Sequence, residues 1–224
     1  MYFLNRKEAG QKLAEQTARY KDADATVFAL PRGGAVLGFE IAASLRAPLD
    51  LIITKKIGHP QNPEYAIGAV AEDGPVLFNR DEVRAPGAEW WQKEIEKAHR
   101  EIKRRRKTYL RDAPPAPLNE KTAIIVDDGI ATGLTMKAAI LEMKRRKARL
   151  VVVAVPVIPY EIAQMLKALN VELAALDIDP YFLGAVGAYY QDFAQVTDEE
   201  VIFLLKQATW TAHRTISARL SPKP

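Results

Sequence analysis

No cysteine occurs among the 224 residues of the chain. Disulfide bonds, thiol nucleophiles and thiolate metal sites are therefore excluded, and the redox compartment stays undecided. The chain also lacks a long apolar run, because the longest one, LVVVAVPVIP at 150–159, is too short to cross a bilayer and contains two prolines. The N-terminal residues do not form the apolar core of a signal peptide. We therefore expect a soluble, cytoplasmic protein with no membrane partner.

The excess of charge of one sign is small. The 32 Lys and Arg residues face 28 Asp and Glu residues, which leaves a formal net charge of +4. This excess permits an anionic partner, but most charges offset each other on the surface. Hydrophobic residues make up 48% of the chain and charged residues 27%, which is typical of a folded domain.

Short apolar runs alternate with stretches of helical periodicity along most of the chain. The runs that we predict as strands are 26–31, 49–57, 121–128, 149–158 and 171–178. The first four are continuous rather than alternating, which is typical of strands buried on both faces of a parallel sheet. Apolar residues recur at helical spacing around 37–45 and 136–143. This order predicts an α/β fold, with an open, mostly parallel twisted sheet flanked by helices.

Two regions interrupt the alternation. Between about 66 and 80, Asp73 and Gly74 lie between strand-like flanks and predict a β-hairpin. The segment 88–112 predicts an amphipathic helix, and 113–119 predicts a stiff linker. The apolar stripe of this helix comprises Trp91, Ile95, Ala98, Ile102 and Tyr109.

The stretch IIVDDGIATGLT at 124–135 has the most distinctive composition of the chain. It follows a predicted strand and leads into a helix, which is where parallel sheets bind ligands. Gly129 and Gly133 let the backbone approach an anion closely. Asp127 and Asp128 are suited to accept hydrogen bonds from vicinal hydroxyls or to face a divalent cation. Together these features indicate a phosphorylated sugar.

The alternative for this stretch is that the two acids only cap the helix and the glycines only shape the turn. A single cap requires neither two acids nor two added threonines, Thr132 and Thr135, so we favour the ligand site. The stretch lacks the Gly-Lys-Ser/Thr ending of a P-loop, and the chain contains no Gly-x-Gly-x-x-Gly. A GTPase or a dinucleotide enzyme is therefore disfavoured.

The longer stretch IIVDDGIATGLTMKAAI resembles the phosphoribosyl-pyrophosphate (PRPP) signature of type I phosphoribosyltransferases: a hydrophobic strand, two acids, a small-residue loop closing in Thr-Gly, and a helix. The resemblance implies that Asp127 and Asp128 engage the ribose hydroxyls, directly or through water bound to Mg²⁺, without an independent protein cage for the metal. The residues implied to bind the ribose and its 5′-phosphate are Asp127, Asp128, Gly129, Ala131, Thr132, Gly133, Leu134 and Thr135.

A second stretch, ALPRGGAVLGFEIA at 29–42, resembles the pyrophosphate loop of the same family. It implies that Arg32 meets the leaving pyrophosphate with the N–H groups of Gly33 and Gly34, and that the Pro31–Arg32 peptide bond is cis. Read alone, Arg-Gly-Gly is an ordinary strand-to-helix turn. The presence of both stretches favours the binding loop.

Lys55 and Lys56 end the second predicted strand. Alternation puts their side chains on opposite faces, so we expect only one of them to reach pyrophosphate and favour Lys55. The segment 57–74 occupies the position of the family's flexible catalytic loop and predicts a mobile β-hairpin flap. Within it Glu64 is the candidate catalytic acid or base, although a solvated loop carboxylate is the simpler interpretation.

The resemblance covers about 22–158 and implies a single domain over 1–224, with a helical insertion at about 85–112 and a small hood from about 1–20 and 179–224. The hood contains a last helix opened by a capping box at Thr197 and Glu200. Its aromatic side chains are either available to stack on a base or part of a small satellite core. The stacking candidates are Tyr181, Phe182 and Tyr189.

The implied reaction is displacement of pyrophosphate from C1 of PRPP by a ring nitrogen, with Mg²⁺ as cofactor. Ala131 stands where 6-oxopurine members of the family carry an acid, so the loop sequence Ala-Thr-Gly is closer to that of adenine and uracil members. The resemblance does not identify the acceptor. The sequence is also compatible with a homo-oligomer.

Two rival functions remain. One is a PRPP-binding regulatory protein that contacts nucleic acid through KRRRK at 103–107. Glu101 can pair with Arg105 on that helix, however, so we disfavour nucleic acid. The other is a PRPP-using enzyme with a non-base acceptor, or a phosphosugar hydrolase.

Overall fold

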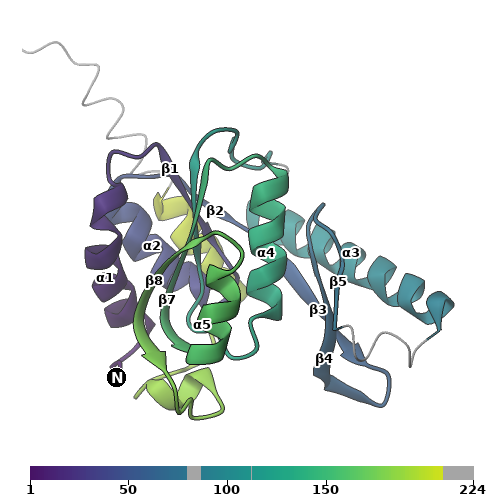
Figure 1. Ribbon diagram of the computed structural model, residues 1–224. Coiled ribbons are helices and arrows are strands. Elements are labelled where there is room, and N and C mark those ends of the chain that lie inside the picture. The colour runs from purple at the N-terminus through teal and green to yellow at the C-terminus, as the bar shows by residue number, and fades with distance from the viewer. Residues whose placement is uncertain (80–86, 112, 209–224) are drawn as a thin grey trace, which may run out of the picture.

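The computed structural model describes residues 1–79, 87–111 and 113–208, except for the side chain of Glu64. The main sheet has five strands in the order β2-β1-β6-β7-β8, and every neighbouring pair is parallel. Figure 1 shows this twisted sheet between helices, which confirms the predicted α/β fold. The strands are β1 (Ala25–Ala29), β2 (Leu49–Leu51), β6 (Thr122–Val126), β7 (Leu150–Pro159) and β8 (Glu172–Asp179).

Helices cover both faces of this sheet. α1 (Arg6–Thr17) and α2 (Gly34–Leu45) pack against one face, and α4 (Leu134–Arg145) and α5 (Tyr160–Lys167) pack against the other. In β6, Ile124 belongs to the core under α1 and α2, whereas Ile125 belongs to the core under α4 and α5. Every residue of β6 is buried for this reason, which explains its continuous apolar sequence.

The predicted strand 49–57 is wrong as a single element. The chain changes direction after β2, and residues Thr54–His59 form β3 in a separate antiparallel sheet of order β3-β4-β5. The N–H group of Ile53 bonds to the carboxylate of Glu72 at 3.3 Å and not to a strand. Ile52 and Ile53 are both buried at the bend. The apolar run in the sequence therefore continues across the bend and gives no sign that the strand ends there.

The predicted hairpin around Asp73 and Gly74 is confirmed up to residue 79. β4 (Asn62–Ala71) and β5 (Leu77–Phe78) pair in antiparallel orientation, and the N–H of Gly74 bonds to the carbonyl of Ala71 at 3.2 Å. β3 and β4 form a further hairpin, so most of the predicted flap is regular sheet. Residue 80 lies outside the described part of the chain.

The predicted amphipathic helix is α3 (Ala88–Leu110). Trp91, Ala98 and Ile102 are buried, and this helix packs beside the small sheet (Figure 1). The capping box is confirmed as well: the N–H of Thr197 donates to Glu200 at 2.7 Å, and the N–H of Glu200 donates to the Thr197 hydroxyl at 3.2 Å. The helix that follows runs over 198–208 to the limit of the described residues, while residue 112 lies outside them. Two short 3₁₀ turns, η1 (Ala18–Tyr20) and η2 (Val186–Tyr189), complete the described elements.

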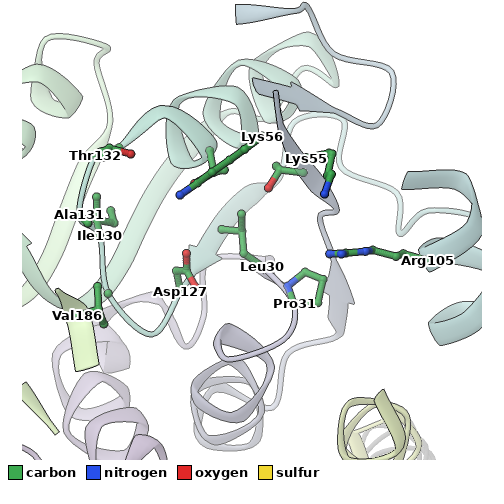
Figure 2. Close-up of a pocket in the computed structure, with 14 residues that line it drawn as sticks. Leu30, Pro31, Lys55, Lys56, Arg105, Asp127, Ile130, Ala131, Thr132 and Val186 are labelled. Atoms are coloured by element: carbon green, nitrogen blue, oxygen red, sulfur yellow. The ribbon is translucent and has the colours of Figure 1, made fainter. Parts of the chain in front are cut away.

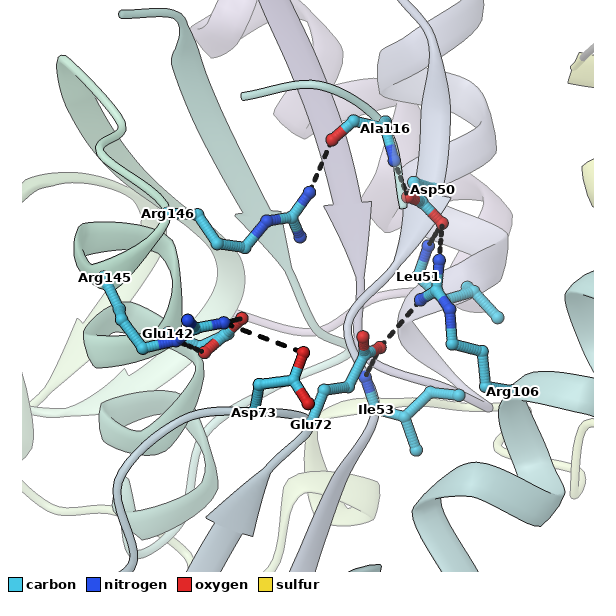
Figure 3. A network of polar contacts seen from close by, with 10 residues as sticks. All are labelled: Asp50, Leu51, Ile53, Glu72, Asp73, Arg106, Ala116, Glu142, Arg145 and Arg146. Carbon is cyan, nitrogen blue, oxygen red and sulfur yellow. Dashed lines mark hydrogen bonds and ion pairs between the residues drawn. The ribbon is translucent and has the colours of Figure 1, made fainter. Parts of the chain in front are cut away.

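A buried charge network fastens α3 to the two sheets (Figure 3). Arg106 donates to Glu72 at 2.8 Å and lies 3.7 Å from the carboxylate of Asp50. Asp50 also accepts hydrogen bonds from the N–H groups of Leu51 and Ala116, both at 2.7 Å. The position of α3 is therefore set by charge pairing as well as by its apolar stripe.

Candidate active site

The two predicted binding loops leave neighbouring strands of the main sheet. β1 and β6 pair with Ala29 opposite Val126, and each loop begins where its strand ends. After β1 the chain continues to β2 on one side, and after β6 it continues to β7 on the other side. This reversal makes the gap between β1 and β6 a topological switch point, where open α/β sheets bind ligands.

Gly33 and Gly34 allow the two loops to touch. A Cβ atom on Gly33 would lie 1.8 Å from Oδ2 of Asp128, and one on Gly34 would lie 2.6 Å from the carbonyl oxygen of Val126. A side chain at Gly34 would require the backbone after β6 to move, and one at Gly33 would require the carboxylate of Asp128 to move. Packing therefore requires both glycines, in addition to any contact that their N–H groups make with an anion.

The two adjacent acids have different surroundings. Asp127 lines a pocket, whereas Oδ2 of Asp128 accepts a hydrogen bond from Nε of Arg6 at 2.7 Å. The N–H of Asp128 donates to Asp127 at 2.9 Å, and the carbonyl of Asp128 accepts from the hydroxyl of Tyr190 at 2.6 Å. Burial, and then the charge of Asp128, hold the pKa of Asp127 well above its ordinary value, while Lys56 lowers it. Asp127 is thus the acid that faces the pocket.

Helix α4 begins at this pocket without a capping side chain. Its N-cap is Gly133, which has a φ of 74° in the left-handed region and no side chain to accept a hydrogen bond. Among the described residues, neither Asp127 nor Asp128 bonds to the first turn, so the interpretation of these acids as helix caps is wrong. The N–H groups at this end of α4 and the hydroxyls of Thr132 and Thr135 are consequently available to an anion.

The pocket between these elements has a volume of about 370 Å³ (Figure 2). Three cationic side chains line it, while Asp127 is the carboxylate among its lining residues. The lining residues are Leu30, Pro31, Thr54, Lys55, Lys56, Arg105, Asp127, Gly129, Ile130, Ala131, Thr132, Gly133, Thr135 and Val186. The pocket therefore contains most of the residues that the PRPP signature implies, although Asp128 and Leu134 lie outside its lining.

Both lysines reach the pocket, which the predicted alternation did not allow. Lys56 extends across the cavity above Asp127, and Lys55 points toward the side where Arg105 lies (Figure 2). β3 is an edge strand, so the long lysine stems can reach the cavity from either side of it.

Arg32 does not line the pocket. The Pro31–Arg32 peptide bond is cis, as the resemblance implied, and Nη1 of Arg32 lies 3.8 Å from Oδ1 of Asp198. Asp198 also accepts a hydrogen bond from the hydroxyl of Tyr109 at 2.7 Å. Burial, and then this hydrogen bond, raise the pKa of Tyr109 to about 12. A pyrophosphate contact from Arg32 would require its guanidinium to turn away from Asp198.

None of the three predicted stacking residues lines the pocket. Tyr181 is 86% exposed, whereas Tyr189 is buried and stacks on Phe182 with ring centroids 5.4 Å apart. Val186, from the same segment, lies at the pocket beside Ile130 (Figure 2). A valine among aromatic residues gives no sequence signal for this role.

Arg105 is the pocket residue that the sequence interpretation missed most clearly, because KRRRK was taken as a solvated face. Its position three residues after Ile102 and four before Tyr109, on the apolar stripe, is the signal that could have found it. Glu64 lies in β4, but its side chain is outside the described residues.

The described residues contain no cluster of three or more His, Asp or Glu side chains that could hold a metal ion. Asp127 could contribute an oxygen to a cation that is otherwise held by a substrate and water, which is the usual situation for Mg²⁺. None of the described helices has the length and apolar character that a membrane crossing requires.

The fold is that of the type I phosphoribosyltransferase family. Residues 3–173 match the family model described as the phosphoribosyl transferase domain, and the chain belongs to this family. Proteins from two strains of Mycobacterium tuberculosis, MT0597 and Rv0571c, both provisionally named as phosphoribosyl transferases, are 38% identical over 208 residues. That alignment covers 92% of this chain but 47% of each relative, so the chain spans about half their length. The crystal structure of TT1426 from Thermus thermophilus is 39% identical, with a TM-score of 0.77 over 92% of this chain and 99% of that one.

Proposed function

We propose that the protein transfers ribose 5-phosphate from PRPP to a nitrogenous base and releases pyrophosphate, in a cytoplasmic nucleotide-salvage reaction with Mg²⁺ as cofactor. The observation that carries this proposal is a single pocket that combines a carboxylate, an uncapped helix N-terminus and three cations. These are the groups that bind ribose hydroxyls, a terminal phosphate and a pyrophosphate, respectively.

In this proposal each part of PRPP has its own partners. Asp127 accepts hydrogen bonds from the ribose hydroxyls, with Asp128 holding the loop in place through Arg6. The segment 131–135 and the N-terminus of α4 bind the 5′-phosphate. Lys55 binds the pyrophosphate, and Arg32 joins it after the guanidinium leaves Asp198.

The reaction breaks the bond between C1 of the ribose and a pyrophosphate oxygen, and the electron pair leaves with pyrophosphate. The lone pair of the acceptor nitrogen forms the new bond to C1, and the proton displaced from that nitrogen passes to a base, for which Glu64 is the candidate. The cationic side chains stabilise the negative charge that develops on the leaving group. Mg²⁺, when bound to PRPP, would neutralise part of the same charge.

The acceptor would lie against the apolar side of the pocket formed by Ile130 and Val186. Ala131 provides no acid there, so a 6-oxopurine is the less favoured acceptor, and adenine- or uracil-like bases are favoured. We propose that 1–20 and the residues after 179 form the hood over this base. The contact between these two segments is supported by two backbone hydrogen bonds, both at 2.8 Å. The N–H of Phe3 donates to the carbonyl of Tyr189, and the N–H of Gln191 donates to the carbonyl of Phe3.

Pairing within the KRRRK segment argues against nucleic-acid binding. Arg104 and Arg105 both bond to Glu101, and Arg106 bonds to the buried carboxylate of Glu72. Lys103 and Lys107 then remain as exposed candidates for contacts with a nucleic-acid backbone on the outer face of this helix.

Incubation with PRPP and Mg²⁺ and a panel of bases, with release of pyrophosphate as the signal, tests the proposal. We expect release with one class of base, and a rise in melting temperature when PRPP binds. The matched variant Asp127→Asn should lose both signals. The proposal fails if PRPP neither raises the melting temperature nor releases pyrophosphate with any acceptor, and PRPP binding without turnover would favour the regulatory rival.

A further inference from the structure

Helix α3, which lies outside the two signature loops, brings a guanidinium to the phosphate-binding pocket. Arg105 lines the cavity from the side opposite Thr132, and its side chain points from α3 toward Lys55 and Pro31 (Figure 2). Ile102 and Tyr109 are buried on the same stripe of the helix. Packing of these neighbours therefore fixes the direction in which Arg105 projects.

The hydrogen bonding of Arg105 leaves one edge of its guanidinium available. Nε donates to Oε1 of Glu101 at 2.7 Å, and the side chain is 32% exposed. Within the described part of the chain, Glu101 is its hydrogen-bond partner. The two terminal amino groups can therefore form a forked pair of hydrogen bonds with a phosphate.

The distribution of charge in the pocket indicates which phosphate this is. Lys56 lies above Asp127, at the side where the ribose would bind, whereas Lys55 and Arg105 lie together on the side of Pro31 (Figure 2). Asp127 is the carboxylate in the lining and lowers the net charge at the ribose side, whereas Glu101, which pairs with Arg105 on the other side, shares its charge with Arg104. The side of Lys55 and Arg105 is consequently suited to the most highly charged part of a ligand.

We propose that Arg105 binds the pyrophosphate group of PRPP, so that the helical insertion supplies a phosphate ligand that the two loops do not provide. This inference rests on the proposed function, because it assigns one part of the same substrate. Glu101 is then a positioning residue, which holds Nε and turns the amino groups toward the cavity.

The test measures dissociation constants for PRPP with Mg²⁺, for inorganic pyrophosphate and for ribose 5-phosphate by calorimetry. Arg105→Ala should weaken binding of PRPP and pyrophosphate about tenfold or more and leave ribose 5-phosphate within about twofold. Arg105→Lys should show an intermediate loss, because a point charge replaces the fork. Arg104→Ala is the matched control, because it removes a guanidinium that also pairs with Glu101 but is 60% exposed. This variant should change all three dissociation constants by less than about twofold.

The outcomes separate this inference from the proposed function. If the wild-type protein binds PRPP and Arg105→Ala binds it equally well, the inference is wrong and the proposed function stands. An equal loss for all three ligands would show a structural role and would also overturn the inference. If pyrophosphate binds through Arg105 but PRPP does not bind, the proposed function fails while Arg105 keeps its role in anion binding.

Discussion

Nε of Arg6 donates a hydrogen bond to Oδ2 of Asp128 at 2.7 Å, between residues 122 positions apart in the chain. The same guanidinium donates to the carbonyl of Ala194 at 2.7 Å and lies 3.7 Å from the centre of the Phe193 ring. One side chain thus joins α1, the loop after β6 and the segment before the last helix. The orientation of the PRPP-signature loop therefore depends on residues at both ends of the described chain.

Arg6→Ala should lower the free energy of unfolding by about 2 kcal/mol, because it leaves the mostly buried carboxylate of Asp128 without its partner. Urea denaturation measures this change. The control is Lys12→Ala, which removes a partly exposed pair with Glu8 on the same helix and should cost less than about 0.5 kcal/mol. Equal costs for the two variants would contradict a special role for Arg6.

Gly33→Ala should disrupt the contact between the two loops, since its Cβ atom would lie 1.8 Å from the carboxylate of Asp128. We expect both a lower melting temperature and the loss of any shift caused by PRPP. Gly87→Ala serves as the control, because a Cβ atom there meets no atom of the described residues within 4 Å. Gly87 is the N-cap of α3, so that variant should change the free energy of unfolding by less than about 1 kcal/mol in either direction. A Gly33→Ala protein that behaves in the same way would refute the packing argument.

The parts of the fold that the sequence predicted are those in which local pattern and packing agree. Continuous apolar runs marked β1, β6 and β7 because both faces of those strands are buried. The stripe of α3 was equally clear, since one face of that helix packs on the small sheet. The break between β2 and β3 left no such trace, because Ile52 and Ile53, the two residues that form it, are apolar and buried.

The parts of the candidate site that the sequence did not predict depend on contacts between distant segments. The loops after β1 and β6 could be located because their glycines and acids form continuous motifs. The direction of Arg32 could not, because Asp198 lies 166 positions away and competes for its charge. Arg105 and Val186 belong to segments whose approach to the pocket is set by tertiary packing alone.

Glu72 should give the stability of the protein a pH dependence of unusual sign. Burial is the main cause that raises its pKa, while Arg106 lowers it. The folded chain therefore keeps the proton of the Glu72 carboxyl group at pH values where the unfolded chain has lost it. The stability that Glu72 contributes is therefore fully present below about pH 4 and is lost as the pH rises through the folded-state pKa. In urea denaturation at a series of pH values, the stability of Glu72→Gln relative to wild type should rise from about pH 4 upward and then level off.

Glu101→Gln provides a control of the opposite sign. Hydrogen bonds from Arg104, and then from Arg105, lower the pKa of Glu101 to about 2. The stability that this carboxylate contributes is present above about pH 4 and is lost as the pH falls through the folded-state value. The disadvantage of Glu101→Gln should therefore shrink with falling pH, and profiles of the same direction in both variants would contradict the assignment of Glu72.

Asp198→Asn should tighten PRPP binding by up to about fivefold. The carboxylate of Asp198 lies 3.8 Å from Nη1 of Arg32, so under the proposed function it would compete with pyrophosphate for that guanidinium. Asparagine keeps a carbonyl oxygen that can accept the hydrogen bond of the Tyr109 hydroxyl, so the packing of α3 against the last helix should persist. Glu199→Gln removes the same charge from the next, exposed residue and should leave the dissociation constant of PRPP unchanged. Weaker PRPP binding in Asp198→Asn would mean that Asp198 positions Arg32 for the substrate, and tighter binding means that it holds Arg32 away until the substrate arrives.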